Sequence, residues 1–145
     1  MLKNIPSVLS PLLLKVLMEM GHGDEIVIAD GNFPAESMAK NAIVIRADGH
    51  GVPEILDAIL QLMPLDQYAE KPCALMEVLP DDTCAKPNIW LKYQRTLALY
   101  GENPQAIEMI ERFAFYKRAQ QAYAIVATGE KAVYANILLK KGVVK

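Results

Sequence analysis

The sequence predicts a layered α/β domain, and two observations support that prediction. Short apolar stretches of strand length alternate with helix-like segments along the whole chain, which is the pattern of strands and helices packed in layers. Apolar residues make up 52% of the 145 residues and charged residues 22%, as in an ordinary globular protein. A chain of this length suffices for one core, so we expect residues 1–145 to form a single domain.

The first predicted helix has a recognisable beginning and end. Ser10 before Pro11 is the pattern of an N-cap followed by proline at the first helical position, and apolar residues recur at helical spacing as far as Met20. Gly21 then predicts a left-handed residue that ends the helix. After a short polar turn, residues 26–29 form an apolar run of strand length.

The remaining elements follow from the same kinds of pattern. Pro53 opens a helix that runs to residue 63, and Pro64 ends it. The apolar run at residues 42–45 predicts a second buried strand. The other predicted strands are residues 73–79, 123–128 and 135–140, and the other predicted helices are residues 89–99, 105–111 and 115–122.

Charge and hydropathy argue against two classes of partner. The net charge is −2 and no run of Lys and Arg occurs, so we expect no nucleic-acid binding. The longest apolar stretches fall far short of the ~20 residues that a spanning helix needs, and the first residues lack the pattern of a signal peptide. We therefore expect no membrane role.

The chain lacks the motifs of several common kinds of site. Its cysteines, Cys73 and Cys84, have no metal-site spacing and are too few for a disulfide framework, so we expect buried thiols in a reducing cytoplasm and no metal site. No glycine-rich phosphate loop and no Gly-x-Ser-x-Gly nucleophile motif occur. Among the kinds of chemistry considered, these absences leave acid–base chemistry on an uncharged substrate.

Polar residues follow two of the predicted strands, where ligands bind in open α/β sheets. Asp30 comes directly after the strand at 26–29 and precedes a glycine. Its carboxylate is suited to accept hydrogen bonds from sugar hydroxyls, although capping the turn is the commoner use of Asp-Gly. Arg46 and Asp48 follow the next strand, and there an Arg–Asp pair or a turn is the favoured interpretation.

His22 stands between two glycines directly after the first helix. The glycines give the backbone around it conformations that are closed to other residues, and a helix C-terminus stabilises a protonated imidazole. Both features suit a proton donor that works near neutral pH. The alternative is a surface turn with a capping histidine.

Arg112 is followed by a run of aromatic residues. An arginine over an aromatic ring, with its forked set of donors, is a common way to hold a pair of sugar hydroxyls. The alternative is an arginine whose stem packs on the surface. We expect Phe113 and Phe115 to belong to the core.

Tyr134 and Asn136 stand at the beginning of the last predicted strand. Together they offer donors and acceptors that suit hydroxyl groups. The alternative is a strand edge with ordinary polar residues.

Four stretches together resemble the family of L-fucose mutarotases and D-ribose pyranases, and the similarity runs almost the whole length of the chain. The Arg-Phe-Ala-Phe-Tyr run and the Tyr-Ala-Asn-Ile-Leu-Leu-Lys-Lys-Gly run are similar to the fucose branch more than to the ribose branch. The stretches are residues 17–25 with Asp30 and Pro34, residues 44–49, residues 112–116, and residues 128–130 with 134–142.

The resemblance implies a fold particular to that family, a ring-shaped homo-oligomer that is often a decamer, and active sites at or near subunit contacts. It implies that His22 is the proton donor in the interconversion of the α and β anomers of a free sugar, L-fucose first, without a cofactor. It implies that the sugar is held by Asp30, Arg112, Tyr134 and Asn136, with Ala135 contributing backbone groups only.

The chemistry is a ring opening and closing. The ring oxygen gains a proton while the anomeric hydroxyl loses one, the aldehyde turns about C1–C2, and the ring closes on the other face. General acid–base catalysis of such steps is typically worth about 10²–10⁴-fold. His22 is the expected donor, whereas the acceptor is left open between Tyr134, Asp30 and a bound water.

Four other functions fit parts of the pattern. One is a purely structural ring protein, since layered α/β folds host many roles. A non-catalytic sugar-binding or regulatory ring protein would keep Asp30, Arg112 and Asn136 without needing His22. A ribose-type pyranase would use the same site on another sugar. A phosphosugar isomerase would need a phosphate cradle, which the sequence does not show.

Overall fold

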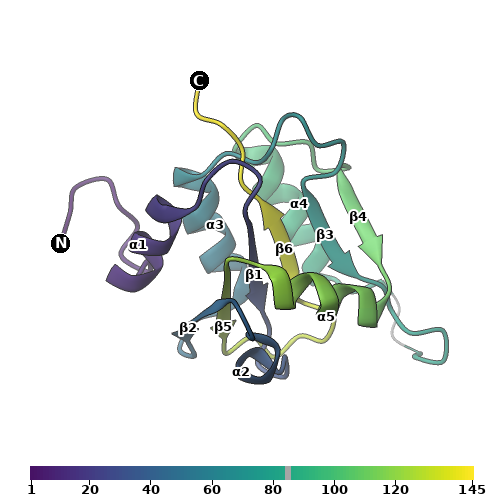
Figure 1. The fold of residues 1–145 in the computed structure, drawn as a ribbon. Coiled ribbons are helices and arrows are strands. Elements are labelled where there is room, and N and C mark those ends of the chain that lie inside the picture. The colour runs from purple at the N-terminus through teal and green to yellow at the C-terminus, as the bar shows by residue number, and fades with distance from the viewer. Residues whose placement is uncertain (84–85) are drawn as a thin grey trace.

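The computed structural model describes residues 1–83 and 86–145. Cys84, which we expect to be a buried thiol, lies outside the described residues. The helices and strands, in chain order, are α1 (Pro11–Glu19), β1 (Glu25–Ala29), α2 (Ala35–Met38), β2 (Ile43–Ala47), α3 (Val52–Leu62), β3 (Cys73–Met76), α4 (Ile89–Leu99), β4 (Ile107–Ile110), α5 (Arg112–Gln121), β5 (Ala124–Thr128) and β6 (Ile137–Lys140) (Figure 1).

The strands form one six-stranded sheet in the order β2-β5-β1-β6-β3-β4. The β2–β5, β5–β1 and β3–β4 pairs are parallel, and β6 runs antiparallel to both β1 and β3. Every strand except β6 therefore ends on the same side of the sheet, called here the C-terminal edge because the strand C-termini gather there, and β6 begins there. Figure 1 shows this edge at the bottom, next to α2.

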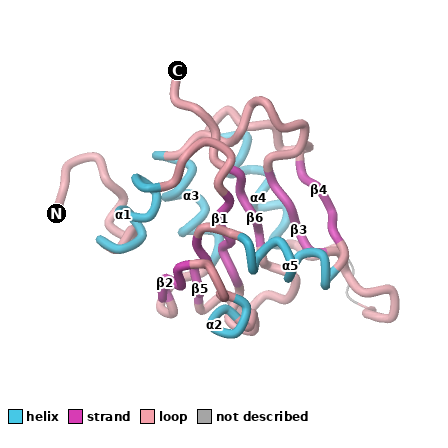
Figure 2. Tube along the Cα trace, viewed as in Figure 1, coloured by secondary structure: helices cyan, strands magenta, loops and turns pink. Residues whose placement is uncertain are grey.

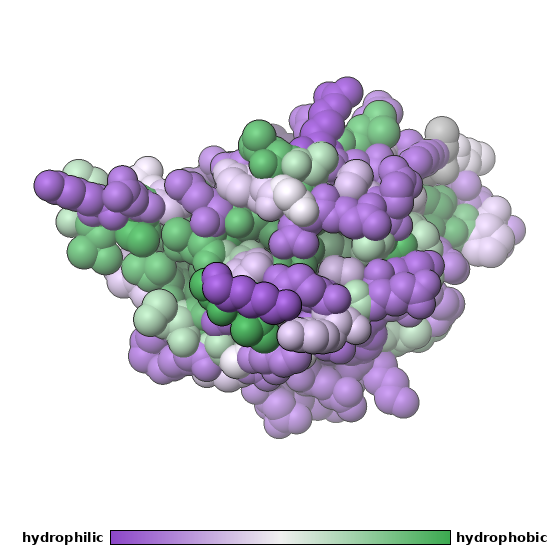
Figure 3. Space-filling view, turned by 90° about the horizontal axis from the view of Figure 1, so that it is seen from above, coloured by the Kyte–Doolittle hydropathy of each residue, from purple (hydrophilic) through white to green (hydrophobic). Residues whose placement is uncertain are grey.

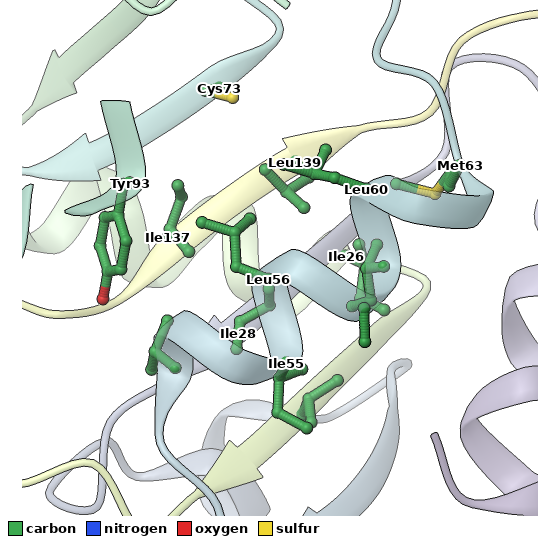
Figure 4. Close-up of a cluster of buried hydrophobic side chains, with 14 of the residues drawn as sticks. Ile26, Ile28, Ile55, Leu56, Leu60, Met63, Cys73, Tyr93, Ile137 and Leu139 are labelled. Atoms are coloured by element: carbon green, nitrogen blue, oxygen red, sulfur yellow. The ribbon is translucent and has the colours of Figure 1, made fainter. Parts of the chain in front are cut away.

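Helices cover both faces of the sheet, which confirms the layered α/β class (Figure 2). Ile26 and Ile28 of β1 face α1, α3 and α4, whereas Val27 and Ala29 of the same strand face α2 and α5, because successive side chains of a strand point to opposite faces. Figure 4 shows the first of these layers, where Leu56 of α3 and side chains of β1 and β6 meet.

Most elements lie where the sequence predicts them. Helix α4 has the predicted bounds, and α3 differs from its prediction by one residue at each end. The side chain of Ser10 accepts a hydrogen bond from the backbone N–H of Leu13 at 3.2 Å, as an N-cap does. Cys73 is buried with a free thiol, as expected, and burial raises its pKa to about 12.

The prediction of a helix over residues 105–111 is wrong, because this segment contains strand β4. The apolar residues Ile107 and Ile110 have helical spacing but also suit a strand. Pairing decides between the two, since Ile107 aligns with Cys73 in a parallel ladder with the buried strand β3. Local sequence does not reveal a partner more than thirty residues away.

Strand β2 was expected to be buried, and that prediction is wrong. It is an edge strand of the sheet, and of its residues only Ile45 is buried. In contrast to the central strands, β2 has a neighbour on one side only, β5. The expected Arg46–Asp48 pair is confirmed, with Nε of Arg46 donating to Oδ2 of Asp48 at 3.1 Å.

Two expectations about single residues are also wrong. The left-handed residue after α1 is Gly23, at φ +87°, and not Gly21, because the chain leaves α1 in an extended conformation at Met20. Phe113 is exposed, whereas Phe115 is fully buried as expected. Residues two apart on a helix point to different sides, so α5 buries only one of the two rings.

No helix within the described ranges is long and apolar enough to cross a membrane.

Candidate active site

A cavity of about 310 Å³ opens at the edge where the five parallel-running strands end and β6 begins. The topology explains why residues far apart in sequence meet there. Asp30 follows β1, Arg112 follows β4, and Asn136 precedes β6. The cavity is lined by Asp30, Asn32, Phe33, Met76, Leu79, Asp82, Arg112, Tyr116, Val133, Tyr134 and Asn136.

Asp30 lies at the floor of this cavity and is only 6% exposed. Its Oδ1 accepts the backbone N–H of Asn32 at 3.0 Å, and its own N–H donates to Oδ1 of Asn136 at 2.8 Å. Burial raises the pKa of the Asp30 carboxyl, and the backbone hydrogen bonds from Asn32, Ala135 and Phe33 oppose that rise. Asp30 thus caps the turn and lines the cavity at once.

The raised pKa of Asp30 predicts a stabilising substitution. The contribution of such a carboxyl to stability is full below its pKa in the unfolded chain and is lost as the pH rises through its higher pKa in the folded protein. We expect Asp30→Asn, which removes the buried charge, to raise the free energy of unfolding at pH 7 by on the order of 1 kcal/mol, and to raise it less at pH 4. Urea unfolding at the two pH values measures the difference.

The matched control is Asp48→Asn. Asp48 is exposed, and the hydrogen bond from Arg46 lowers its pKa, so its contribution is present above its unfolded pKa and is lost as the pH falls. We expect no stabilisation from this variant at pH 7. An Asp30→Asn protein that loses stability equally at both pH values would contradict the role of the buried charge.

Arg112 is the first residue of α5, directly after the N-cap Glu111. Its Nε donates to the hydroxyl of Tyr116 at 3.2 Å, and its guanidinium lies 5.5 Å from the ring centre of Tyr116 and 5.7 Å from that of Phe113. Phe33 packs edge-on against Tyr116. The expected placement of the arginine over an aromatic ring is therefore found, with Tyr116 one helical turn away.

Two aromatic residues of α4 hold the backbone of the segment before β6. The indole N–H of Trp90 donates to the carbonyl of Tyr134 at 2.8 Å, and the buried hydroxyl of Tyr93 donates to the carbonyl of Ala135 at 2.6 Å. Tyr134 has a φ of +56°, a conformation that costs a non-glycine residue energy. Ala135 itself is fully buried, so only its backbone groups are placed near Asp30.

His22 lies at the other end of the strands, away from the C-terminal edge. It belongs to the α1–β1 connection, at the top of Figure 1, whereas Asp30 follows the other end of β1. A strand of that length spans about 17 Å. One copy of the chain therefore brings Asp30, Arg112, Tyr134 and Asn136 to one cavity, and it does not bring His22 there.

The partner of His22 is Asp66, which the sequence did not single out. Nε2 of His22 lies 2.9 Å from Oδ1 of Asp66, and the Tyr68 ring lies 5.6 Å from the imidazole. The hydrogen bonds from His22 and from the backbone N–H of Tyr68 hold the pKa of the Asp66 carboxyl below its ordinary range. The buried carboxylate fixes one ring nitrogen and leaves Nδ1 on the other side of a half-exposed imidazole.

The helix end that was expected to favour a protonated His22 has another cation. Nζ of Lys141 donates to the carbonyls of Leu17 and Met20 at 2.7 and 2.5 Å. Lysine near a helix C-terminus satisfies the carbonyls that lack intrahelical partners. Asp66, and not the end of α1, is thus the group that orients the imidazole.

In the part of the chain that the structure describes, no three His, Cys, Asp or Glu side chains come together as metal ligands would. The other histidine, His50, pairs with Glu54 one turn along α3, with Nδ1 of the ring 2.7 Å from Oε1.

Comparisons with known proteins agree with this architecture. A sequence model described as the RbsD / FucU transport protein family matches residues 3–144. The fucose mutarotase of Homo sapiens is 50% identical over 145 residues, covering 98% of this chain and 94% of that protein. The crystal structure of FucU from Bifidobacterium longum has a TM-score of 0.95 and 56% identity, covering 99% of this chain and 100% of that one.

A second solved structure is similar over the same length. The fucose mutarotase of Streptococcus pneumoniae, crystallised in complex with L-fucose, has a TM-score of 0.94 and 51% identity, with 99% of this chain and 100% of that chain covered.

Proposed function

This chain belongs to the RbsD / FucU transport protein family, and we propose that it is an L-fucose mutarotase, an isomerase that interconverts the α and β anomers of the free sugar. The observation that carries the proposal is the cavity at the sheet edge, where a carboxylate, a guanidinium, a phenol and an amide converge. Relatives at about half identity over nearly the whole chain are named fucose mutarotases.

The chemistry of the cavity suits a neutral monosaccharide. Asp30 offers acceptors from the floor, Asn136 contributes its amide group, Arg112 offers donors, and the rings of Phe33 and Tyr116 supply an apolar wall. A few fixed polar groups within an apolar lining are what orient a small ligand. We propose that Asp30, Arg112, Tyr134 and Asn136 bind the hydroxyls and that the backbone of Ala135 positions Asp30.

The proton donor comes from a second copy of the chain in this proposal. His22 is the donor, and in one copy it lies across the sheet from the cavity. Its imidazole is half-exposed and oriented by Asp66, so it is available to a neighbouring molecule. A homo-oligomer that sets the His22 loop of one copy over the cavity of another completes the site.

The surface around the termini fits such an assembly. Figure 3 looks from above onto the end from which the C-terminus leaves in Figure 1, and apolar patches lie there among hydrophilic residues. Leu12 and Met18 of α1 and Val144 near the C-terminus are exposed. Apolar surface of this kind marks contact sites. We propose a ring of identical subunits, a decamer, in the cytoplasm.

The reaction needs two proton transfers in this site. His22 donates a proton to the ring oxygen as the C1–O5 bond opens, and the anomeric hydroxyl gives up its proton on the other side. After rotation about C1–C2, the ring closes on the opposite face and both transfers reverse. Positioned groups of this kind speed proton transfer by about 10²–10⁴-fold. His22 supplies the first transfer, and we propose that Tyr134, Asp30 or a bound water accepts the proton in the second.

The decisive experiment is magnetisation exchange between the two anomeric protons of L-fucose by NMR. We expect micromolar wild-type protein to raise the exchange rate clearly above that of buffer, with D-ribose and D-galactose as comparison sugars. Exchange at the buffer rate despite measurable fucose binding would identify a non-catalytic sugar-binding protein. Faster exchange for ribose than for fucose would indicate a pyranase instead.

A further inference from the structure

A carboxylate outside the predicted set lies in the cavity. After β3 the chain runs along the cavity mouth, where Leu79 and Asp82 line it. The backbone N–H of Glu77 donates to the carbonyl of Ile110 at 2.8 Å, which ties the start of this segment to β4. The N–H of Asp82 donates to the carbonyl of Leu79 at 3.0 Å, so a turn presents the Asp82 carboxylate.

The hydroxyl of Tyr134 is bound to this turn at two points. It donates to Oδ2 of Asp82 at 2.5 Å and accepts the backbone N–H of Leu79 at 3.3 Å. A hydroxyl that donates to a carboxylate is polarised and becomes a better acceptor on its other side. The phenol oxygen of Tyr134 is therefore prepared to take a proton while it passes its own to Asp82.

The backbone of Tyr134 fixes the position of its phenol ring. The backbone of Tyr134 is in the left-handed region, where the N–H of Trp90 holds its carbonyl at 2.8 Å. A conformation of this cost persists only where the surroundings impose it, and such positions gather at functional sites. The fold thus holds the tyrosine hydroxyl at the cavity, beside the Asp82 carboxylate.

The other carboxylate of the cavity lies in a different environment. Asp30 is buried on the floor and already accepts backbone N–H groups. Asp82 is exposed at the cavity mouth, where its negative charge stays in contact with water. The two carboxylates therefore have different environments, and a pair of that kind takes different roles.

We propose that Asp82 is a positioning residue that acts through Tyr134, forming a two-group relay that removes the proton of the anomeric hydroxyl. The inference deepens the proposed mutarotase function and rests on it. It selects Tyr134 from the three acceptors that the sequence leaves open, and it adds the group that receives the proton next.

The relay balances in atoms and electrons. The O1–H bond breaks as the Oη–H bond of Tyr134 forms, and the original Oη–H bond breaks as Oδ2 of Asp82 is protonated. The electron pair left on O1 forms the C1=O1 carbonyl, the C1–O5 bond breaks, and O5 takes the proton of His22. Ring closure on the other face runs each of these steps in reverse.

Asp82→Asn distinguishes a relay, in which Asp82 receives the proton, from a latch, which is a contact that only holds Tyr134 in place. The asparagine Oδ1 still accepts the Tyr134 hydroxyl, so a structural contact survives, but a neutral amide does not hold the transferred proton. We expect the saturated exchange rate to fall about 10²-fold, with fucose affinity within about threefold of wild type. Asp82→Glu, which restores a carboxylate, should recover part of the rate.

The matched control is Asp81→Asn, which removes the same charge from the exposed neighbouring position and should leave the rate unchanged. Tyr134→Phe should lower the rate as Asp82→Asn does, and the double variant should be no slower than Tyr134→Phe alone. The same anomeric exchange measurement gives every rate, and fucose titration gives the affinities.

Several results would overturn the relay. They are an Asp82→Asn rate equal to wild type, additive losses in the double variant, or loss of affinity and rate together, which would make Asp82 a latch. A wild-type protein that does not exceed buffer would instead overturn the mutarotase function itself, so the two failures are distinguishable.

Discussion

His22→Ala is expected to bring the exchange of L-fucose anomers down to the rate of buffer, while the sugar still binds. The imidazole is the one group in the proposal that donates a proton to the ring oxygen, and loss of a general acid is worth about 10²–10⁴-fold in rate. Affinity should change little, because the residues that we propose bind the sugar hydroxyls, Asp30, Arg112, Tyr134 and Asn136, all remain in the cavity.

The chain supplies its own control for that experiment. His50 is the second of its two histidines, and it is half-exposed and paired with a carboxylate as His22 is. We expect His50→Ala to exchange fucose at the wild-type rate. Fast exchange by His22→Ala, measured by anomeric proton NMR, would remove His22 from the role of donor.

Activity is expected to return when two inactive variants are mixed. His22→Ala lacks the donor, and Arg112→Ala weakens sugar binding through loss of the guanidinium above Tyr116. At fucose concentrations below the wild-type Kd, each variant alone should stay near the buffer rate. If each site combines a cavity of one copy with the His22 of another, random assembly at equal amounts restores about one quarter of the wild-type sites.

The comparison must show that subunits have exchanged. Mixing after mild denaturation and refolding, with mass spectrometry of the assemblies, establishes mixed oligomers. A mixture without recovered exchange, in spite of confirmed subunit exchange, would place donor and cavity within one copy and would contradict the shared site. Two portions of His22→Ala, mixed in the same way, provide the baseline.

Local pattern was enough for elements whose signals are local. Helix α1 begins at a capping serine and a proline, and α3 begins beside Pro53. Strands β1 and β5 are central, buried and rich in branched residues. The pattern failed at β4, which it predicted as a helix, and at β2 it predicted the strand but not its exposure. Pairing with a remote strand decides the first outcome, and the place of β2 as an edge strand decides the second. Neither is encoded within a short window of sequence.

The sequence by itself determined the α/β class, most helix positions and, through family resemblance, the residues proposed for the sugar site. Only the tertiary structure decided which side chains meet. Asp66 lies 44 residues from His22, and Asp82 lies 52 from Tyr134, so neither pairing leaves a periodic signal. The direction of β1 also places Asp30 and His22 beyond opposite ends of that strand. A strand separates its two ends by its own length, and for this reason one copy alone does not assemble the proposed site.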